Sequence, residues 1–314
     1  MDPNELAQQA VDAINAVSGE HHGHRAAHAK GTLCAATFTP APDARTLSRA
    51  AHFCDGPVRA HVRFSNGSGD PAAPDFEPRE GRGMATKFYL PDGSTTDVVG
   101  ITLPAFFVNT VDGFFDFCRA RTPEPATGEP DPTAIGTFLE QHPEALTAGA
   151  AVLAATPPES YLRCVYNSLH AYRFVDDSGS GRYGRYRWDP ETGEASISID
   201  DAEARGPDYL QDDLAARLGT GPAAFTLAAQ IAEDDDPIAD PSIPFPDERP
   251  WVTLGRLEIT GLAHDREQGE DVLVFDPTRV TDGIELSDDP ILRFRTHAYA
   301  ESVLRRTGVA RDPV

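Results

Sequence analysis

The stretch that decides the fold is GMATKFYL at residues 83–90, a short β-like run bounded by turn-forming residues. Similar runs precede and follow it, each separated from the next by Gly, Pro and Asp. The expected strands cover residues 32–39, 58–65, 83–90, 96–102, 169–176, 182–189, 195–199, 223–232 and 251–260. The sequence DSGSG at 177–181 joins two of them as a hairpin. Strands at this spacing predict an antiparallel sheet or barrel.

Helical segments are expected at both ends of the chain and between the strands. Near the N-terminus, Leu6, Val11, Ile14 and Val17 recur with helical spacing on one face. The expected helices cover residues 4–17, 106–121, 132–154 with an interruption near Pro143, 208–219 and 290–306. The acidic, Pro-rich segment 233–249 is expected as a loop. Because no internal repeat or long linker divides the chain, the sequence predicts one α+β domain over residues 1–314.

The composition excludes several classes of function. The chain has 314 residues, of which 27 are Lys or Arg and 50 are Asp or Glu, giving a formal net charge of -23. Since a surface this acidic repels phosphate backbones, we expect no nucleic-acid partner. The most apolar stretch, residues 145–155, is too short to span a membrane. The first residues lack the basic start and apolar core of a signal peptide, which predicts a soluble, cytoplasmic protein.

Neither the cysteines nor a histidine-rich segment matches a complete metal site. The cysteines are Cys34, Cys54, Cys118 and Cys164. They form no CxxC pair and no zinc spacing, so we expect reduced, mostly buried thiols. The run HHGH at residues 21–24 lies close to His28 and could bind Zn or Ni, but no carboxylate or cysteine is spaced to complete that ligand set. A flexible surface run is therefore the favoured interpretation, and a metal site is the alternative.

Residues that can carry chemistry fall into three clusters, at 25–31 (RAAHAKG), at 62–65 with 81–89, and at 293–299 (RFRTHAY). In the third cluster Arg295 and Tyr299 lie four residues apart, so on a helix they share one face. An arginine beside a phenol oxygen favours the phenolate, which is a hard anionic ligand suited to ferric iron. A surface Arg–Tyr pair is the ordinary alternative, just as a lone histidine is more often structural than catalytic.

In their order and type these clusters resemble the motifs of the catalase superfamily. The shared motifs are HAKG at 28–31, RFS at 63–65, RGxAxKFY at 82–89, DVVG at 97–100 followed by PAFF at 104–107, and RxxxY at 295–299. Each motif is weak alone, but five of them in order are specific. The resemblance covers most of the chain. Because the chain is much shorter than a full catalase, it is most similar to the small catalase-related peroxidases.

The resemblance implies a minimal antiparallel β-barrel with flanking helices, against which haem b binds. It divides the single haem domain into an N-terminal helix and arm at 1–27, a barrel with helices at 28–262, and a proximal haem helix at 288–308. A closed barrel would also remove the exposed edges of so many short strands. The C-terminal extensions of large catalases are lacking, so no NADPH is expected. Relatives in this superfamily associate, which leaves a homodimer open.

The resemblance also assigns roles to residues on both sides of the haem. Tyr299 is implied as the axial ligand of the haem iron, with Arg295 keeping it ionised. His28 is implied as the distal acid–base group, oriented by Ser65. The other cofactor-binding positions are Arg25, Arg63 and Arg306 for the haem propionates, and Val99, Phe106, Phe107 and Phe114 for the lining of the pocket. Core packing explains the phenylalanines equally well.

One position departs from the family pattern. Large catalases have asparagine directly after the glycine of the Asp-x-Val-Gly segment, where this sequence has Ile101. That asparagine donates a hydrogen bond to peroxide, and losing one positioned donor costs about 10²–10³ in rate at comparable sites. Ala27, directly before His28, is smaller than the valine usual in the family. We therefore expect a distal pocket that is more apolar and roomier.

These features predict a haem peroxidase that reduces hydrogen peroxide or organic hydroperoxides with an organic reductant and has weak catalase activity. His28 would take a proton from the peroxide and return it to the leaving oxygen. Two alternatives stay open. The chain could rearrange or oxidise a specialised biosynthetic substrate, such as a fatty-acid hydroperoxide or a hydroxylamine, or it could bind haem without catalysis. The intact His28 and Ser65 disfavour the last, because haem storage needs no acid–base pair.

Overall fold

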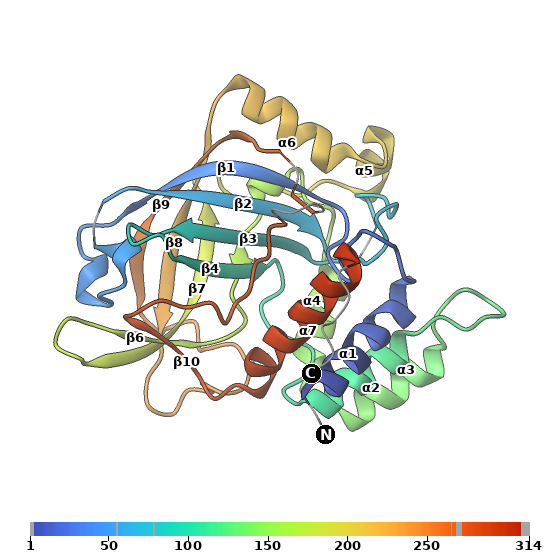
Figure 1. Ribbon diagram of the computed structural model, residues 1–314. Helices are drawn as coiled ribbons and strands as arrows, with labels where there is room; N and C mark the ends of the chain where they lie inside the picture. The colour runs from blue at the N-terminus through green and yellow to red at the C-terminus, as the bar shows by residue number, and fades with distance from the viewer. Residues whose placement is uncertain (1–2, 55, 78, 265, 268–271, 309–314) are drawn as a thin grey trace.

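Ten strands form one continuous antiparallel sheet in the computed structural model, which describes residues 3–54, 56–77, 79–264, 266–267 and 272–308. The strands are β1 (Gly31–Pro40), β2 (Val58–Asn66), β3 (Arg82–Tyr89), β4 (Thr95–Ile101), β5 (Tyr166–Asn167), β6 (Tyr172–Val175), β7 (Gly181–Pro190), β8 (Ala223–Ile231), β9 (Trp251–Leu262) and β10 (Ile284–Leu286). Their order in the sheet is β10-β6-β7-β5-β4-β3-β2-β1-β9-β8. A further pairing joins β7 to β8 and closes the sheet into the barrel of Figure 1.

The ring of the barrel contains every strand except β6 and β10, which continue the sheet outward from β7. Within the ring, β1 pairs with β2 on one side, where Thr37 faces Arg59, and with β9 on the other, where Phe38 faces Leu257. Closure pairs the ring strands with neighbours on both sides, which removes the exposed edges that short strands would otherwise offer. The predicted antiparallel barrel is confirmed.

Aromatic side chains fill the interior of the barrel. Phe38, Phe64, Phe88 and Phe225 are fully buried, and Trp188 is almost so. The Phe38 and Phe88 rings meet edge to face with their centroids 5.1 Å apart, a favourable arrangement for aromatic pairs. Full burial of each such side chain contributes about 1.5–3 kcal/mol. The interior is therefore a packed core, and a ligand has to bind outside it.

The helices lie in two groups outside the barrel. They are α1 (Pro3–Ser18), α2 (Val111–Arg121), α3 (Pro132–Gln141), α4 (Ala145–Ala154), α5 (Ile199–Arg205), α6 (Tyr209–Thr220) and α7 (Pro290–Thr307). The first helix packs against α7 and α2, and in Figure 1 this group lies in the lower part of the view, with α5 and α6 at the top. Among the described residues, no helix is long and apolar enough to cross a membrane.

Two expected elements are corrected by the structure. Residues 195–199 form no strand; Ser196 makes only an isolated bridge, and Ser198 caps α5 by accepting a hydrogen bond from the Asp201 amide. The helix expected from residue 106 begins only at Val111, because Thr110 caps α2. In both places a hydroxyl side chain that accepts from the backbone sets the start of a helix, which replaces the end of the expected strand at Ser198 and delays the expected helix at Thr110. The helical segment 132–154 is split near Pro143, as predicted.

Candidate active site

A cavity of about 1260 Å³, open solvent included, lies between strands β2, β3 and β4 of the barrel and the helices α1 and α7. Most of its lining is apolar, with a small number of charged and polar side chains, the composition that is usual for a small-molecule or cofactor site. The predicted site residues that line it are Arg25, His28, Arg63, Ser65, Val99, Phe106, Phe114, Arg295, Tyr299 and Arg306. Ala27 also lines the cavity. Val11 and Ile14 of α1 line it too, although the sequence predicted them only as part of the apolar face of a helix and not as site residues.

His28 lies just before β1 and is held in an uncommon backbone conformation, with φ of 56°. Its amide donates to the Gly67 carbonyl over 3.1 Å, and its carbonyl accepts from Arg63 Nη1 over 2.9 Å. Its ring atom Nδ1 shares a hydrogen bond of 3.0 Å with Ser65 Oγ. A non-glycine residue with positive φ persists only where the surroundings hold it, and such positions cluster at functional sites. The backbone and the ring of His28 are thus fixed independently.

The glycine of β3 explains how the His28 ring fits against the barrel. A Cβ atom at Gly83 would lie 2.8 Å from Ser65 Oγ and 2.9 Å from His28 Cε1, closer than real Cβ contacts. Glycine normally weakens a strand, and it is found where another group must approach the backbone closely. Because Gly83, the second residue of β3, has no side chain, it leaves room for the His28–Ser65 pair.

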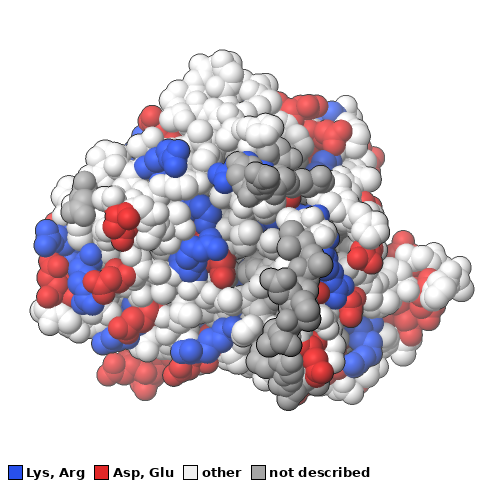
Figure 2. Space-filling model, in the orientation of Figure 1, with Lys and Arg blue, Asp and Glu red and all other residues white. Residues whose placement is uncertain are grey.

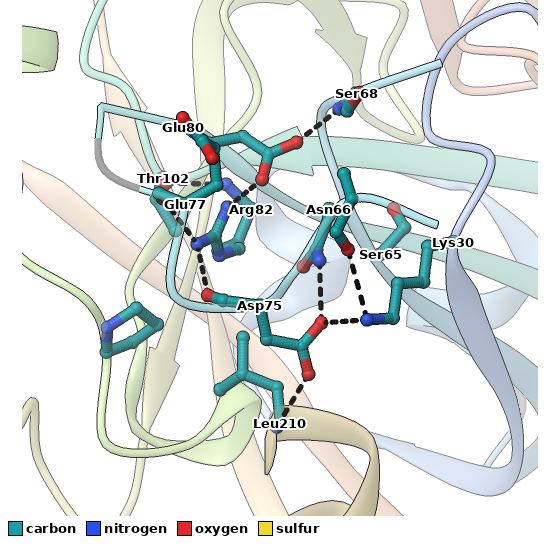
Figure 3. Close-up of polar contacts among 12 residues, drawn as sticks. Lys30, Ser65, Asn66, Ser68, Asp75, Glu77, Glu80, Arg82, Thr102 and Leu210 are labelled. Atoms are coloured by element: carbon teal, nitrogen blue, oxygen red, sulfur yellow. Dashed lines mark hydrogen bonds and ion pairs between the residues drawn. The ribbon is translucent and has the colours of Figure 1, made fainter. Parts of the chain in front are cut away.

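A buried polar network behind β2 and β3 supports the segment on which His28 rests. Figure 3 shows Arg82 between the Glu80 carboxylate, 2.6 Å away, and the Asp75 carbonyl, 2.8 Å away. Glu80 in turn accepts a hydrogen bond from the Ser68 amide. The Ser68 carbonyl accepts from the amide of Ala29, the residue after His28, over 3.0 Å. Arg82 is 2% exposed, so these contacts are buried, and they support the segment that carries His28.

The charge state of His28 follows from its surroundings. Burial lowers the pKa of His28 to about 3, and the positive charges of Arg63, Arg295 and Arg25 act in the same direction. The ring is therefore neutral at physiological pH and has one nitrogen available as a proton acceptor. When Nδ1–H donates to Ser65 Oγ, the acceptor is Nε2.

On the other wall, α7 presents Tyr299 and Arg295 to the same cavity. Arg295 Nη2 donates a hydrogen bond to the Tyr299 hydroxyl oxygen, and its Nη1 donates to His170 Nε2 over 2.9 Å. Burial acts to lower the pKa of Arg295, but the Tyr299 oxygen raises it overall. Arg295 is thus a permanent cation directed at the phenol oxygen, as the four-residue spacing predicts.

The position of Arg295 is fixed by the N-terminus of its own helix. Asp289 caps α7 by accepting from the amides of Ile291 and Leu292. Its second oxygen lies 2.6 Å from His170 Nδ1. Because arginine can only donate, His170 accepts from Arg295 at Nε2 and donates to Asp289 at Nδ1. One carboxylate therefore starts the helix and orients the chain of contacts that reaches Tyr299.

Three arginines meet at one end of the cavity, and a single carboxylate holds them together. Glu267 lies 2.8 Å from Arg25 Nε, 2.6 Å from Arg63 Nε and 2.8 Å from Arg306 Nη1. Burial acts to raise the pKa of Glu267, but the three guanidinium groups lower it overall. Glu267 itself does not line the cavity, whereas all three arginines do. It backs the cluster from the side away from the cavity, leaving the guanidinium groups to face a ligand.

The sequence as a whole matches one known protein family. The sequence model of the catalase family matches residues 7–313. The chain belongs to the catalase family. It is 47% identical over 304 residues to a catalase-related peroxidase of Mycolicibacterium paratuberculosis, covering 96% of this chain and 95% of that one. A catalase-related peroxidase of Synechococcus elongatus is 30% identical, covering 95% and 88%.

Solved catalase structures show the same fold. A crystal structure of a fungal catalase superposes with a TM-score of 0.82 at 24% identity, covering 92% of this chain and 60% of that one. Catalase A of Saccharomyces cerevisiae gives the same TM-score at 23% identity and covers 91% and 62%. This chain therefore spans about three fifths of the length of these catalases, and the shared part is the barrel with its flanking helices.

Two of the positions predicted from the catalase family pattern do not line the cavity. Phe107 stacks on Phe117 with ring centroids 4.4 Å apart, within an aromatic cluster between helices. Ile101 ends β4, and its side chain lies beside Gly81, where an added Cβ atom would come within 2.9 Å of Ile101 Cδ1. It lies two residues after Val99, which does line the cavity, so both are on the same face of the strand.

Three residues that organise this site were not predicted from the sequence. His170 carries no motif and lies 119 positions from Asp289, to which it is bonded. The sequence DDP before α7 is a typical helix start, which could have identified Asp289 as a cap but not as a partner of His170. Glu267 follows β9 in an irregular segment without a recognisable pattern. For these residues only the fold reveals the contact.

Proposed function

We propose that this oxidoreductase of the catalase family is a haem-dependent peroxidase that reduces hydrogen peroxide or organic hydroperoxides with an organic reductant and dismutates peroxide weakly. The observation that carries the proposal is the single cavity lined by both His28 and the Arg295–Tyr299 pair. In the overall reaction one peroxide accepts two electrons and two protons from two molecules of reductant and leaves as an alcohol, or water, plus water. The similarity to two catalase-related peroxidases supports this assignment.

The residues present fit haem b. Phe106, Phe114 and Phe294 contribute apolar walls, and the Arg25–Arg63–Arg306 cluster faces the cavity where two carboxylates of a cofactor could pair with it. Tyr299 supplies a phenol oxygen that Arg295 holds in place, a ligand type known for ferric haem. When bound, haem supplies the iron that activates peroxide and the ring that accepts oxidising equivalents.

His28 would move the proton between the two oxygens of the peroxide. With its pKa lowered to about 3 by burial, it is neutral and accepts a proton at Nε2 from one peroxide oxygen. It then donates that proton to the other oxygen, which leaves. Ser65 keeps the ring in the required tautomer, and Arg63 fixes the backbone of His28. We expect His28→Ala to lower kcat/KM for peroxide about 10²–10⁴-fold.

Weak dismutation is expected from position 101. Ile101 does not itself line the cavity, but it directly follows the lining residues Val99 and Gly100 on β4, and its side chain has no hydrogen-bond donor with which to orient a second peroxide. We expect Ile101→Asn to raise the dismutation rate, with about 10²–10³-fold, the value of one positioned donor at comparable sites, as the upper limit. Ile101→Val is the matched control, because it changes the volume without adding a donor, and it should leave the ratio of dismutation to peroxidase activity unchanged.

The test is a direct comparison of the two activities in haem-loaded protein. Oxygen release from hydrogen peroxide measures dismutation, and oxidation of a phenol with hydrogen peroxide or cumene hydroperoxide measures peroxidase activity. We expect the second to dominate. Dismutation at a rate typical of a large catalase, with no phenol oxidation, would contradict the proposal. Turnover unchanged in His28→Ala would indicate a haem-binding protein in which this histidine has no catalytic role.

A second candidate function is favoured by the apolar lining. Val11 and Ile14 of α1 extend the aromatic walls of the cavity and could contact a long alkyl chain. Such a wall would suit a fatty-acid hydroperoxide that is rearranged within the site. Product analysis separates the two: a peroxidase yields the alcohol and consumes reductant, whereas an isomerising enzyme consumes the hydroperoxide with no reductant present.

A further inference from the structure

The helix α4 is built entirely from uncharged residues, and one of its apolar faces is exposed. Its sequence is ALTAGAAVLA at residues 145–154, and the two residues of it that are buried are alanines. Leu146 is 56% exposed and Leu153 is 68% exposed. Because these leucines lie seven residues apart, close to two helical turns, they share one face, and the exposed Ala150 lies on that face between them. A helix that is apolar on all sides is ordinarily buried.

The rest of the chain does little to stabilise this helix. With 10 residues, α4 is shorter than the helices that form alone in water, so most of its stability has to come from packing. In the part of the chain that the structure describes, neither Leu146 nor Leu153 belongs to an apolar cluster, and the Glu144 side chain does not cap the first turn. A surface outside the chain that covers the two leucines would supply the packing that α4 lacks.

Charge limits which surface can cover α4. No residue from 145 to 158 is charged, although 25% of the chain is charged and the formal net charge is -23. Figure 2 shows acidic and basic side chains scattered over one face of the molecule. Two copies of so acidic a chain repel each other, and this repulsion is smallest where their uncharged faces meet. A membrane surface is disfavoured, because helices that lie on lipid carry Lys and Arg, and α4 has neither.

The order of the residues in α4 fits a second copy of the same helix. Read backwards, residues 145–154 become ALVAAGATLA, which differs from the forward sequence only by exchanges of Thr with Val and of Gly with Ala. A contact between two copies related by a two-fold axis has to be self-complementary in this way. In an antiparallel pair of α4 helices, Leu146 meets Leu153 of the partner subunit at both ends. Ala150 meets Gly149 of the partner subunit at the centre, where small residues let the helices approach closely.

We propose that α4 is the centre of an antiparallel, two-fold symmetric contact between two copies of this chain. The inference concerns an interaction surface and does not depend on the peroxidase function. A helix of this size is about 15 Å long, so the contact is smaller than a standard stable interface between proteins. The dimer is therefore weak and forms with rising protein concentration, with a Kd in the range of about 1–100 µM.

Analytical ultracentrifugation of the haem-loaded protein over a range of concentrations measures the dimer. We expect Leu153→Glu to raise its Kd at least about tenfold, because the new carboxylate would be buried against Leu146 of the partner subunit. Ile199→Glu is the matched control, since Ile199 is 42% exposed on another helix, α5, and we expect the Kd to stay as it is. Circular dichroism checks that both variants fold. A wild-type protein that stays monomeric at millimolar concentration, or equal effects of the two substitutions, would overturn the proposal.

Cysteine cross-linking tests the antiparallel register. Leu146→Cys and Leu153→Cys are made in separate chains and oxidised mildly, alone and mixed, with the wild-type protein measuring the background from native cysteines such as the partly buried Cys54. Each new cysteine faces the other position in the partner, whereas its own counterpart lies about 10 Å further along the helix axis. A disulfide needs Cα atoms within about 7 Å of each other. We expect a linked dimer from the mixture alone. Equal linking in either variant by itself, or none in the mixture, would contradict the antiparallel contact.

Discussion

At the scale of single residues, the site depends on side chains that hold other side chains. Arg63 is the clearest case, because its guanidinium donates to the carbonyls of His28 and Ala29 and also pairs with Glu267. His28 is therefore connected through one arginine to the carboxylate behind the arginine cluster. Glu267 controls both the charge balance of the cluster and the anchoring of His28.

We expect Glu267→Gln to destabilise the protein by roughly 3 kcal/mol, the usual cost of removing one partner of a buried ion pair. The reason is that Arg63 and Arg306 are nearly buried and would lose the carboxylate that balances them. Urea unfolding at pH 7.5 measures the change. Glu258→Gln is the control, since Glu258 and Arg256 form an exposed pair that should contribute less than about 1 kcal/mol. Equal effects of the two substitutions would refute the argument.

At the scale of elements, α7 sets the geometry of the proximal wall. Pro290 begins the helix, Asp289 caps it, and Gly308 ends it with a positive φ of 67°. Between them the four-residue spacing places Arg295 and Tyr299 on the face turned to the cavity. The same cap orients His170, so the start of the helix and the contacts of Tyr299 are coupled.

Two substitutions at Asp289 separate its roles. Asp289→Ala removes the cap and leaves the His170 Nδ1–H without its acceptor, and we expect a loss of about 2–4 kcal/mol in the free energy of unfolding. Asp289→Asn keeps a capping oxygen, so we expect a smaller loss. It also weakens the acceptor for His170, which should change the spectrum of bound haem through Arg295 and Tyr299. If Asp289→Asn left the spectrum unchanged, the coupling along α7 would be wrong.

At the scale of the whole molecule, three buried histidines make stability depend on pH. Burial lowers the pKa of His28 and of His52 to about 3, and burial lowers the pKa of His170 despite its hydrogen bond to Asp289. Between pH 6.5 and 3 the unfolded chain binds protons that the folded chain excludes, so the free energy of unfolding falls as the pH falls. Above pH 6.5 this contribution to stability is complete.

We expect each of these histidines to contribute up to about 1.4 kcal/mol per pH unit to that fall. Urea unfolding at pH 7.5, 6.5 and 5.5 measures the slope. His52→Phe should lower the slope of the free energy of unfolding against pH by the contribution of one histidine, because a phenyl ring cannot bind a proton. His52 is packed among Phe38, Phe53 and Phe88, so a phenyl ring suits its surroundings. His297→Gln, at an exposed position, should leave the slope as it is. A slope unaffected by His52→Phe would show that the ring is solvated.

Much of the fold could be predicted from the sequence, because long strands and α7 carry their signals locally. Alternation over residues 182–189 and the Arg–Tyr spacing near the C-terminus need no knowledge of partners. The two-residue strand β5 and the contacts of His170 and Glu267 could not be predicted, since each exists only where distant segments meet. The lining of the cavity is of the same kind, as it joins residues of the first helix to residues of the last.

The optical spectrum of the haem-loaded protein tests the central claim most directly. If Tyr299 is the axial ligand and Arg295 holds it, the spectrum should be that of high-spin ferric haem with a tyrosinate charge-transfer band. Tyr299→Phe should abolish that band, while Tyr183→Phe, at a tyrosine outside the cavity lining, should keep it. A low-spin or histidine-ligated spectrum, or a band that survives in Tyr299→Phe, would contradict the account.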